Sequence, residues 1–448
     1  MRDKEEPAGI VTEKGGTMSK KTRFKVSMSI VCLVLLLAVI VAGCAKPAPT
    51  PTPTPTPEPV SKAPLKLGVF ADFSGPVAAE CHAEYKGTTD YFAWVNDEEG
   101  GVGGHKIEWL WDDCKWQIPL AIDAYHRFKQ EGAVCMVSWG SPYILGVKPF
   151  LARDKMPVVS AANNLDFIYG PDPNNAWVYN IAGVAPEEYT TFMAWALDQW
   201  KETRPMRVAL LYPDNSFGRA MLDRFPEWAK ENGIEIVAEQ IAPMMPTDIT
   251  GELISIKRAE PDYVLTRFLA SAMKVVLRDR LSVGLTAPIV SQYIARPFDI
   301  LRHCTEDEAE GIMIANSLAE PTDSTPAVKL ADQICRKYQN KALLEMDHPA
   351  HYLWGISGAV ITVEALRLAV EAVGTGEVTS EVVKLKGFDA IRDYDTKGLM
   401  GHVTFTPTDH RGATQYRIVT IQDNKSVILL DWHDAVPIVD WSKPAATE

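Results

Sequence analysis

From Leu65 onward, short apolar runs alternate with segments of helical periodicity, and this alternation limits the folds open to the chain. One such segment places Tyr85, Thr89, Phe92 and Val95 on a single helical stripe. A strand–helix alternation of this kind predicts a parallel sheet with helices on both faces. We predict strands over residues 65–73, 105–113, 133–139 and 156–161, and helices over 84–101, 120–132 and 143–155.

The alternation continues and gives a second, similar half. After residues 310–316 come two long helices, near 326–340 and 349–373, then a strand at 401–407 and a hairpin-like segment at 415–432. Elements this late in a chain can return to either half, so we expect domains that are discontinuous in sequence. In the second half, before residue 310, we predict strands at 207–213, 234–240, 261–268 and 287–293, and helices at 186–200, 216–233, 248–260 and 270–284.

A glycine-rich stretch at residues 100–104 has the composition of a phosphate-binding loop. It follows a predicted helix and precedes a predicted strand, whereas phosphate loops follow a strand and open a helix. We therefore interpret it as a helix C-cap and turn.

The N-terminal region has the order of features found in an export signal. Four basic residues between Lys20 and Lys25 precede an apolar run from about Ile30 to Val41, which is short for a membrane span. Residues 41–44, Val-Ala-Gly-Cys, resemble the bacterial lipobox, whose cysteine is diacylated and becomes the first residue of the mature protein. We predict a signal peptide at residues 18–43; the alternative is a transmembrane anchor with an incidental cysteine.

Cys44 is therefore the predicted lipidation site. Each buried methylene contributes about 0.8 kcal/mol, so several acyl chains anchor a protein that one chain would not. Residues 1–17 are acidic at their start and fit no signal peptide, which makes Met18 the expected initiator.

Residues 44–64 comprise this cysteine and a Pro/Thr repeat. The repeat has no apolar periodicity and cannot build a core. Alternating proline favours extended polyproline II at about 3.1 Å per residue, a semi-rigid spacer of roughly 60 Å. We interpret it as a linker that holds the following domains away from a membrane surface.

Composition narrows the class of protein further. The formal charge is −13 and no basic stripe is present, which argues against nucleic-acid binding. After Pro64 no uninterrupted apolar run has membrane-spanning length, and the remaining residues suffice for two domains. The cysteines show no CxxC or Cys/His metal spacing, so no metal or other cofactor is expected; Cys135 lies in an apolar run and is predicted to be a buried free thiol.

Several motifs, taken in order, resemble the branched-chain amino-acid substrate-binding proteins of ABC transporters, in the type I periplasmic-binding class. No single motif is specific, but their order and spacing from Leu65 to Trp432 are. The matching stretches are Ser74-Gly75-Pro76, Asn96, Gly100-Gly101-Val102, Gly104, Asp112-Asp113, residues 156–164, 207–222, 309–315 and 401–422.

The resemblance implies an α/β fold of two lobes, each a parallel sheet flanked by helices, joined by three hinge crossovers and closing on a small ligand. Lobe one would comprise residues 65–182 and 317–412, and lobe two 183–316 and 413–433, with 434–448 as a tail.

Ligands of open parallel sheets bind beyond the carboxyl ends of the strands, so the residues that follow each strand are candidates. In the family, a serine, a threonine and nearby backbone groups hold the ligand carboxylate. Ser141 falls on that serine, Ala162 on a backbone contributor and Asn164 on the threonine, and an amide can donate as a hydroxyl does. Phe217 matches an aromatic residue that covers the ligand; core packing is the alternative. The candidate stretches are 72–80, 139–141, 161–164, 214–217, 267–269 and 291–293.

Three departures put the usual ammonium site in doubt. In the family an acidic residue pairs with the ligand ammonium, and Tyr293 occupies its position here. Arg267-Phe268 replaces a pair of glycines that precedes the contact loop of the second lobe. Glu80 replaces an aromatic residue of the first loop. One hypothesis is that Glu80 takes over the ammonium. Another is that the ligand lacks an amine and carries a second acidic or aromatic group, met by Arg267 and Tyr293. An ion pair between Glu80 and Arg267, or two solvated rim charges, is the third possibility.

Cysteine positions add one further prediction. Cys81 and Cys114 follow strands that are neighbours in this topology, so a disulfide between them is possible, and Cys304 with Cys335 is a weaker pair.

The resemblance implies an extracytoplasmic, lipid-anchored, monomeric binding component of an ABC importer. Its partners would be a membrane permease and an amino acid or related small carboxylate. A ligand-sensing receptor of the same fold is the first alternative. A secreted hydrolase is the second, but Ser141 lacks the Gly-x-Ser-x-Gly context, because Trp139 stands where a glycine belongs. Residues 348–351 likewise lack the glutamate of a zinc-hydrolase motif, so we expect binding and not catalysis.

Overall fold

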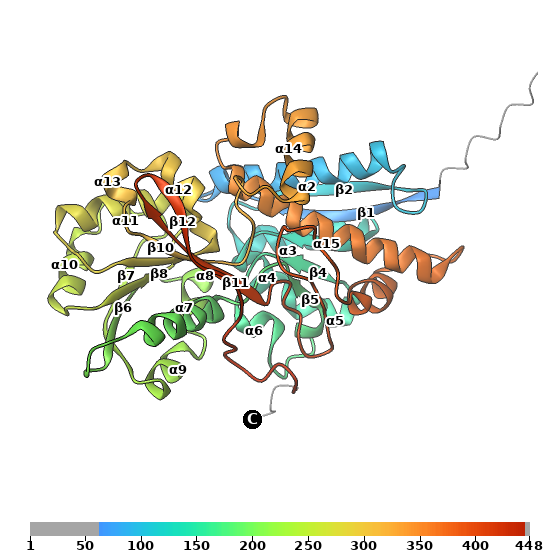
Figure 1. Cartoon of the computed structure of the whole chain (residues 1–448). Coiled ribbons are helices and arrows are strands. Elements are labelled where there is room, and N and C mark those ends of the chain that lie inside the picture. The colour runs from blue at the N-terminus through green and yellow to red at the C-terminus, as the bar shows by residue number, and fades with distance from the viewer. Residues whose placement is uncertain (1–61, 444–448) are drawn as a thin grey trace, which may run out of the picture. The chain divides into compact units, whose positions relative to one another are not determined.

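The computed structural model describes residues 62–443 and arranges them in two sheets (Figure 1). The predicted signal peptide, the expected initiator Met18, the predicted lipidation site Cys44 and nearly all of the predicted Pro/Thr linker lie outside the described residues. The first strand begins at Lys62, which pairs with His105, so the last residues assigned to the linker belong to the sheet.

The first sheet is parallel, with strand order β2-β1-β3-β4-β5. Its strands alternate with helices as the sequence pattern predicts, and β5 is a short strand that the pattern missed. The elements are β1 (Lys62–Ala71), α2 (Ala78–Glu98), β2 (His105–Asp113), α3 (Ile118–Gln130), β3 (Ala133–Ser138), α4 (Ser141–Val147), α5 (Leu151–Asp154), β4 (Val158–Ser160), α6 (Leu165–Ile168) and β5 (Val178–Asn180).

The second sheet has the order β12-β11-β10-β9-β8-β6-β7, with β11 and β12 antiparallel at one edge. Its elements are α7 (Ala185–Gln199), β6 (Met206–Pro213), α8 (Ser216–Arg219), α9 (Phe225–Glu231), β7 (Ile234–Ala242), α10 (Thr250–Arg258), β8 (Tyr263–Thr266), α11 (Ala270–Ser282), β9 (Ile289–Gln292), η4 (Tyr293–Ala295), α12 (Pro297–His303), α13 (Glu306–Ala309), β10 (Met313–Asn316), β11 (Gln415–Gln422) and β12 (Lys425–Asp434).

Between β10 and β11 the chain returns to the first sheet through α14 (Pro326–Gln339), α15 (Pro349–Val373) and α16 (Ser380–Val382). We call β1–β5, α2–α6 and α14–α16 lobe 1, and β6–β12 with α7–α13 lobe 2. The chain passes between the lobes after β5, after β10 and before β11. The residue boundaries proposed for the lobes from the sequence stay predictions.

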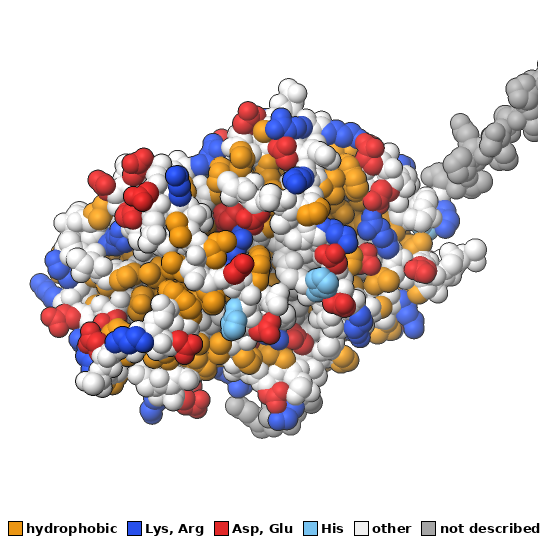
Figure 2. Space-filling model, in the orientation of Figure 1, with side chains coloured by type: hydrophobic (Ala, Val, Ile, Leu, Met, Phe, Trp, Pro, Cys, Tyr) orange, Lys and Arg blue, Asp and Glu red, His pale blue; other side chains and the backbone are white. Residues whose placement is uncertain are grey.

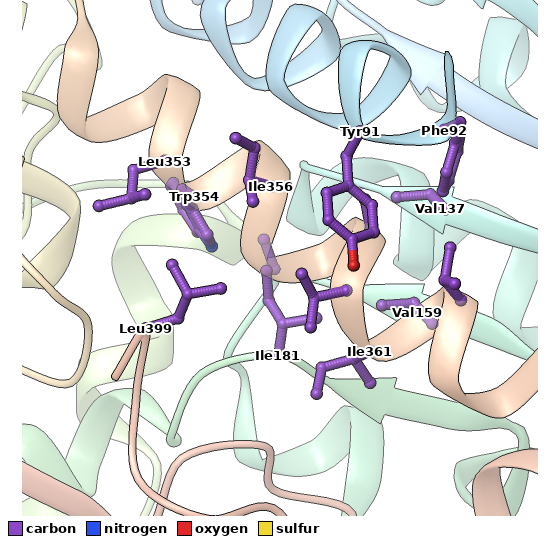
Figure 3. Packing of buried hydrophobic residues seen from close by; sticks show 14 of the residues in the cluster. Tyr91, Phe92, Val137, Val159, Ile181, Leu353, Trp354, Ile356, Ile361 and Leu399 are labelled. Carbon is purple, nitrogen blue, oxygen red and sulfur yellow. The ribbon is translucent and has the colours of Figure 1, made fainter. Parts of the chain in front are cut away.

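Apolar side chains fill both faces of the lobe 1 sheet, as expected for parallel strands covered on each side. Leu67 and Val69 pack with α2 and α15, whereas Phe70 packs with α3 and α4 on the other face. Figure 3 shows the first of these clusters, with side chains of both helices gathered around Val137 and Val159 of the sheet.

Two glycines allow α2 and α15 to cross in close contact. A Cβ atom at Gly87 would lie 2.0 Å from the carbonyl oxygen of Tyr352, and one at Gly355 would lie 2.1 Å from that of Glu84. The Thr88 hydroxyl group donates to the carbonyl oxygen of Gly355 at this crossing (3.2 Å). The approach brings the side chain of Glu84 against α15.

Among the described helices, only α15 is long and apolar enough to cross a membrane. Its most hydrophobic window is 83% buried inside the protein, so its apolar surface is accounted for by core packing.

Some predicted elements differ from the structure. Residues 401–407 form no strand and make only an isolated bridge between Tyr394 and Val403. The helices predicted at 143–155 and 216–233 are each interrupted, at Pro149 and before Pro226, because proline cannot donate the helical hydrogen bond. The glycine-rich stretch does form a turn after α2, where Gly101 has a φ of 90°.

The predicted disulfides are wrong. Cys81, Cys114, Cys304 and Cys335 are free thiols, as is the buried Cys135. Cys81 belongs to α2 and lies in the core cluster on one face of the lobe 1 sheet, whereas Cys114 lies in the cluster on the opposite face. Adjacent strands therefore do not bring these two sulfur atoms together.

The segment predicted as a tail packs against the rest of the protein. After β12, Trp441 enters the lobe 1 core beside Tyr169, and its indole N–H donates to Glu187 at the start of α7 (2.7 Å). Arg411 forms an ion pair with the same carboxylate (2.6 Å). Glu187 thus ties the C-terminal segment to the chain crossings between the lobes.

Charged side chains of both signs are interspersed on the face shown in Figure 2. Lysine and arginine lie among aspartate and glutamate over both lobes, in keeping with an acidic chain that has no basic stripe.

Candidate ligand-binding cleft

A small cavity lies between the lobes, where the carboxyl ends of the strands of both sheets meet. Its free volume is about 20 Å³, room for about one water molecule, so the lobes are nearly closed upon each other. Its walls come from α2, from α15 and from the loops after strands of both sheets. The lining residues are Val77, Glu80, Cys81, Glu84, Trp116, Trp139, Ser141, Ala161, Ala162, Phe217, Arg267, Leu269, Ile294 and Trp354.

Two aspartates shape the loop that leads into α2. Asp72 accepts the backbone N–H groups of Gly75 (2.5 Å) and Val77 (3.1 Å), and Asp113 accepts that of Phe73 (2.8 Å). These hydrogen bonds explain why an aspartate stands at the end of each of the first two strands, and they hold the Ser-Gly-Pro turn in place. They set the first turns of α2 at the cavity, where Glu80 and Glu84 lie one helical turn apart.

Ser141, Ala162 and Asn164 are already hydrogen-bonded within the protein. The Ser141 hydroxyl donates to the Asn164 side-chain oxygen (2.9 Å), and the Asn164 amide donates across the cleft to the carbonyl oxygen of Ser216 (2.8 Å). The Ala162 N–H donates to Ser160 (2.9 Å). Ser141 and Ala162 line the cavity, whereas Asn164 does not. The partner of Ser141 is an amide, which cannot serve as the general base of a serine hydrolase.

Arg267 is the one cationic side chain among the residues that line the cavity. It is 1% exposed and lies over the ring of Phe217, 4.5 Å from its centroid. Its guanidinium group donates to Gln292 and Phe217 in lobe 2 and to the Asn163 side chain in lobe 1. Burial lowers the pKa of Arg267, because desolvation disfavours the charged form.

Arg267 makes no ion pair, since its hydrogen-bond acceptors within the described residues are all amides and carbonyls. A buried guanidinium group gains most from an anionic partner, so this side chain favours an anionic ligand group in the cleft.

Glu80 is 2% exposed, and its carboxylate accepts the backbone N–H of Ser271 at the start of α11 (3.3 Å), across the cleft. The predicted alternative of an ion pair with Arg267 is not formed, and Glu80 is not a solvated rim charge. Glu80 therefore places a carboxyl group at the cavity wall, and no basic side chain of the described residues forms an ion pair with it.

Glu84 lies deeper, and its carboxyl group is hydrogen-bonded to His351 Nδ1 (2.7 Å). Burial and the nearby Glu80 carboxylate raise the pKa of Glu84 well above its usual range, and burial lowers the pKa of His351 to about 3. His351 is therefore neutral at physiological pH. The two carboxyl groups make one end of the cavity acidic.

Tyr293 lies behind the cavity wall and does not line it. Its hydroxyl group donates across the cleft to the carbonyl oxygen of Ala161 (3.0 Å), and its ring meets Trp354 edge to face. The position that carries an acidic residue in the family thus holds the lobes together here.

The sequence pattern missed Glu84, Trp116 and Trp354 as lining residues. Glu84 follows Glu80 by four residues and so shares its helical face, a signal that was present. Trp116 lies just beyond the predicted end of β2. Trp354 comes from the middle of an apolar helix, where no local signal separates a lining residue from a core residue.

Comparison with known proteins places this geometry in a family. The family model described as periplasmic binding protein matches residues 64–426. A Leu/Ile/Val-binding protein homolog from Brucella suis is 22% identical over 344 residues, which cover 74% of this chain and 79% of that protein.

Solved structures with the same fold differ in their ligands. A branched-chain amino-acid ABC transporter protein from Thermus thermophilus, with bound valine, has a TM-score of 0.76 at 22% identity, covering 84% of this chain and 97% of the other. A fatty acid ABC transporter substrate-binding protein from Thermomonospora curvata has a TM-score of 0.71 at 19% identity, covering 84% and 94%. At these identities the likeness establishes the fold. The two-lobed architecture and the extent of the family match together show that the chain belongs to the periplasmic binding protein family.

Proposed function

We propose that this protein is a membrane-tethered solute-binding component of an ABC importer that closes its two lobes on an amino acid or a related small carboxylate. The lipid anchor would be carried by Cys44 and the Pro/Thr linker would act as a leash. Tethering raises the local concentration of the binding domain at its permease while the spacer leaves it free to turn.

The observation that carries this proposal is the buried guanidinium group of Arg267, which lines the cavity without a carboxylate partner. A ligand carboxylate can accept its donors in a bidentate geometry, and that gain is largest where water is excluded. Ser141 and the Ala162 backbone line the same cavity and can add donors if their present bonds rearrange.

Closure follows from the contacts that bridge the lobes. Arg267 reaches Asn163, Tyr293 reaches Ala161, and Glu80 reaches Ser271. Opening the cleft breaks these bonds and exposes the buried groups, while a bound ligand that contacts both walls favours the closed state.

The sequence suggested either that Glu80 pairs with a ligand ammonium or that Arg267 and Tyr293 meet a ligand without an amine. The contacts of the cavity support the first hypothesis more strongly. Glu80 lines the cavity as an unpaired carboxylate, whereas Tyr293 is engaged with Ala161 and does not line it. We therefore assign the anionic end of the ligand to Arg267 and a cationic end to Glu80.

A thermal-shift screen of amino acids, short amides and aromatic acids tests the proposal, because a ligand that binds only the native state raises Tm. We expect a small carboxylate to raise Tm, and Arg267→Gln to weaken its binding by at least about tenfold. Arg204→Gln, on the surface of lobe 2, is the matched control. If no small carboxylate binds the wild-type protein, the proposal is wrong.

The anchor requires a separate test in the full chain. Labelling with a fatty-acid precursor should mark the wild-type protein and not Cys44→Ala. Equal labelling of both would show that Cys44 is not the lipidated residue.

A further inference from the structure

Aromatic rings form much of the wall of the cavity. Trp139 and Trp354 meet nearly edge to face, with centroids 6.1 Å apart and planes at 73°. Trp116 and Phe217 make a second such pair, from opposite lobes, at 6.5 Å and 74°. All four residues line the cavity together with Glu80 and Glu84. Perpendicular ring pairs present both faces and edges to the space between them.

We propose that the cleft selects a zwitterion whose cationic group is an alkylated ammonium, enclosed by Trp116, Trp139 and Trp354 and facing Glu80. This inference rests on the proposed function and deepens it, since it names the chemical class of the ligand. Aromatic faces attract cations through the ring quadrupole, and the attraction is strongest where water is excluded.

The charges of the cavity are arranged for a zwitterion. No ion pair of the described residues joins Arg267 to Glu80 or Glu84. Arg267 donates to Phe217, Gln292 and Asn163. Glu80 instead accepts the Ser271 N–H, and Glu84 is hydrogen-bonded to His351. The guanidinium group and the acidic pair thus mark separate ends of the site. A ligand with one charge of each sign satisfies both ends.

Hydrogen-bond capacity distinguishes an alkylated ammonium from a primary one. A primary ammonium carries three N–H donors that need acceptors once buried. One oxygen of Glu80 already accepts the Ser271 N–H, and one oxygen of Glu84 is engaged in a hydrogen bond with His351. The neighbouring walls are indole rings and the aliphatic side chains of Leu269 and Ile294. An ammonium group without N–H donors needs no further acceptor and gains from every ring face.

The backbone at Trp116 gives independent support. Lys115 and Trp116 both adopt left-handed conformations, with φ of 52° and 58°, which side-chain-bearing residues seldom occupy. The Trp116 N–H donates to the Tyr143 hydroxyl (3.1 Å), which holds this turn in place. Such conformations persist where the surrounding structure imposes them, and they gather at ligand sites. Here the turn sets the indole between Tyr143 and Phe217 at the cavity.

Isothermal titration of the full-length protein with matched probes tests the proposal. The probes are trimethylglycine and 4-(trimethylammonio)butanoate, each compared with its primary-amine parent, and 3,3-dimethylbutanoate, which copies the shape of trimethylglycine without its positive charge. We expect at least one trimethylammonium probe to bind at least tenfold more tightly than its parent amine, and trimethylglycine to exceed its carbon isostere similarly. Equal or tighter binding of the parent amines or of the isostere would overturn the proposal.

Valine and other small carboxylates separate this inference from the function on which it depends. If they bind while neither trimethylammonium probe does, only the alkylated-ammonium assignment is wrong. If no small carboxylate binds, the proposed function itself is wrong.

Variants assign the effect to the aromatic wall. Trp116→Leu should weaken binding of the trimethylammonium probe at least tenfold, and Trp116→Phe should restore part of it, because a ring face returns. Trp111→Leu, at a residue 45% exposed and outside the lining set, is the control and should leave affinity unchanged. Glu80→Gln keeps an acceptor for Ser271 but removes the charge, and it should weaken the probe more than the isostere. Unchanged affinity in folded Trp116→Leu would contradict the proposal.

Discussion

The Tyr293 hydroxyl group donates a hydrogen bond to the carbonyl oxygen of Ala161 across the cleft, at 3.0 Å. Tyr293 follows β9 of lobe 2 and Ala161 follows β4 of lobe 1, and both are buried. The bond therefore exists only while the lobes are closed. It reports on closure without contacting the cavity.

Tyr293→Phe removes this bond and keeps the ring against Trp354. A typical intramolecular hydrogen bond contributes about 0.5–1.5 kcal/mol, so the closed state should weaken by that amount and ligand affinity should fall by up to about tenfold. Small-angle scattering of the unliganded variant should show a larger radius of gyration. Tyr125→Phe loses a bond to Asp154 within lobe 1 and is the control. Equal changes in both variants would contradict a role in closure.

Because α2 and α15 cross in close contact, we expect one added methyl group at this crossing to lower the stability of the protein. Gly355→Ala places a Cβ atom 2.1 Å from the carbonyl oxygen of Glu84, a backbone atom that cannot move aside alone. Overpacking of this kind costs about 1–3 kcal/mol, which outweighs the better helix propensity of alanine. The free energy of unfolding, from denaturant titration, should fall accordingly. Gly251→Ala in α10, where the added atom meets nothing within 4 Å, should leave it unchanged or raise it.

The cysteines of the described domain should remain reduced in the purified protein. Mass spectrometry after alkylation in denaturant without reductant should show five modified cysteines in a soluble form beginning at Ser61. In the native state alkylation should be slow even at Cys304, the least buried of the five, because burial raises the pKa of its thiol to about 12. A pair of unmodified cysteines in denaturant would indicate a disulfide.

Asp223 predicts a pH dependence of stability. Its carboxylate accepts the Leu165 N–H across the lobes (3.2 Å), and burial together with the nearby Asp166 raises the pKa of Asp223 to about 7. The folded state then binds more protons than the unfolded state between about pH 4 and 7, so this group's contribution to stability falls as pH rises through that window. Each unit of pKa shift corresponds to about 1.4 kcal/mol.

Asp223→Asn removes the titration and keeps an acceptor for Leu165. The difference in free energy of unfolding between variant and wild type should therefore shift in favour of the variant from pH 5 to pH 7.5. Using this difference cancels the opposite contribution of buried histidines such as His351, whose lowered pKa favours stability as pH rises. A difference that does not change with pH would show that Asp223 ionises normally.

Much of the fold was predictable because local periodicity and tertiary packing agree. The apolar run at β1 and the long helix at residues 349–373 are both found as predicted, since each buries the face that its pattern indicates. The strand predicted at 401–407 was not found. Its alternation matches a strand, but a strand also needs a partner, and only Val403 is paired with Tyr394.

The cleft was predictable as far as position along strands determines it. Glu80, Phe217 and Arg267 line the cavity because residues beyond the carboxyl ends of parallel strands meet at one edge. The partners that each side chain contacts could not be predicted from its position along a strand. Tyr293 reaches over to Ala161, and Trp354 arrives from a helix far along the chain, so both depend on how the two lobes meet.

The C-terminal segment links the two lobes. After β12 it buries Trp441 in the core of lobe 1, while the Trp441 indole N–H donates to Glu187 of α7 in lobe 2. The backbone N–H groups of Val436 and Ile438 also donate to Thr191 and Glu187 of α7. A reporter fused beyond Trp441 would therefore lie beside the chain crossings and would travel with neither lobe alone.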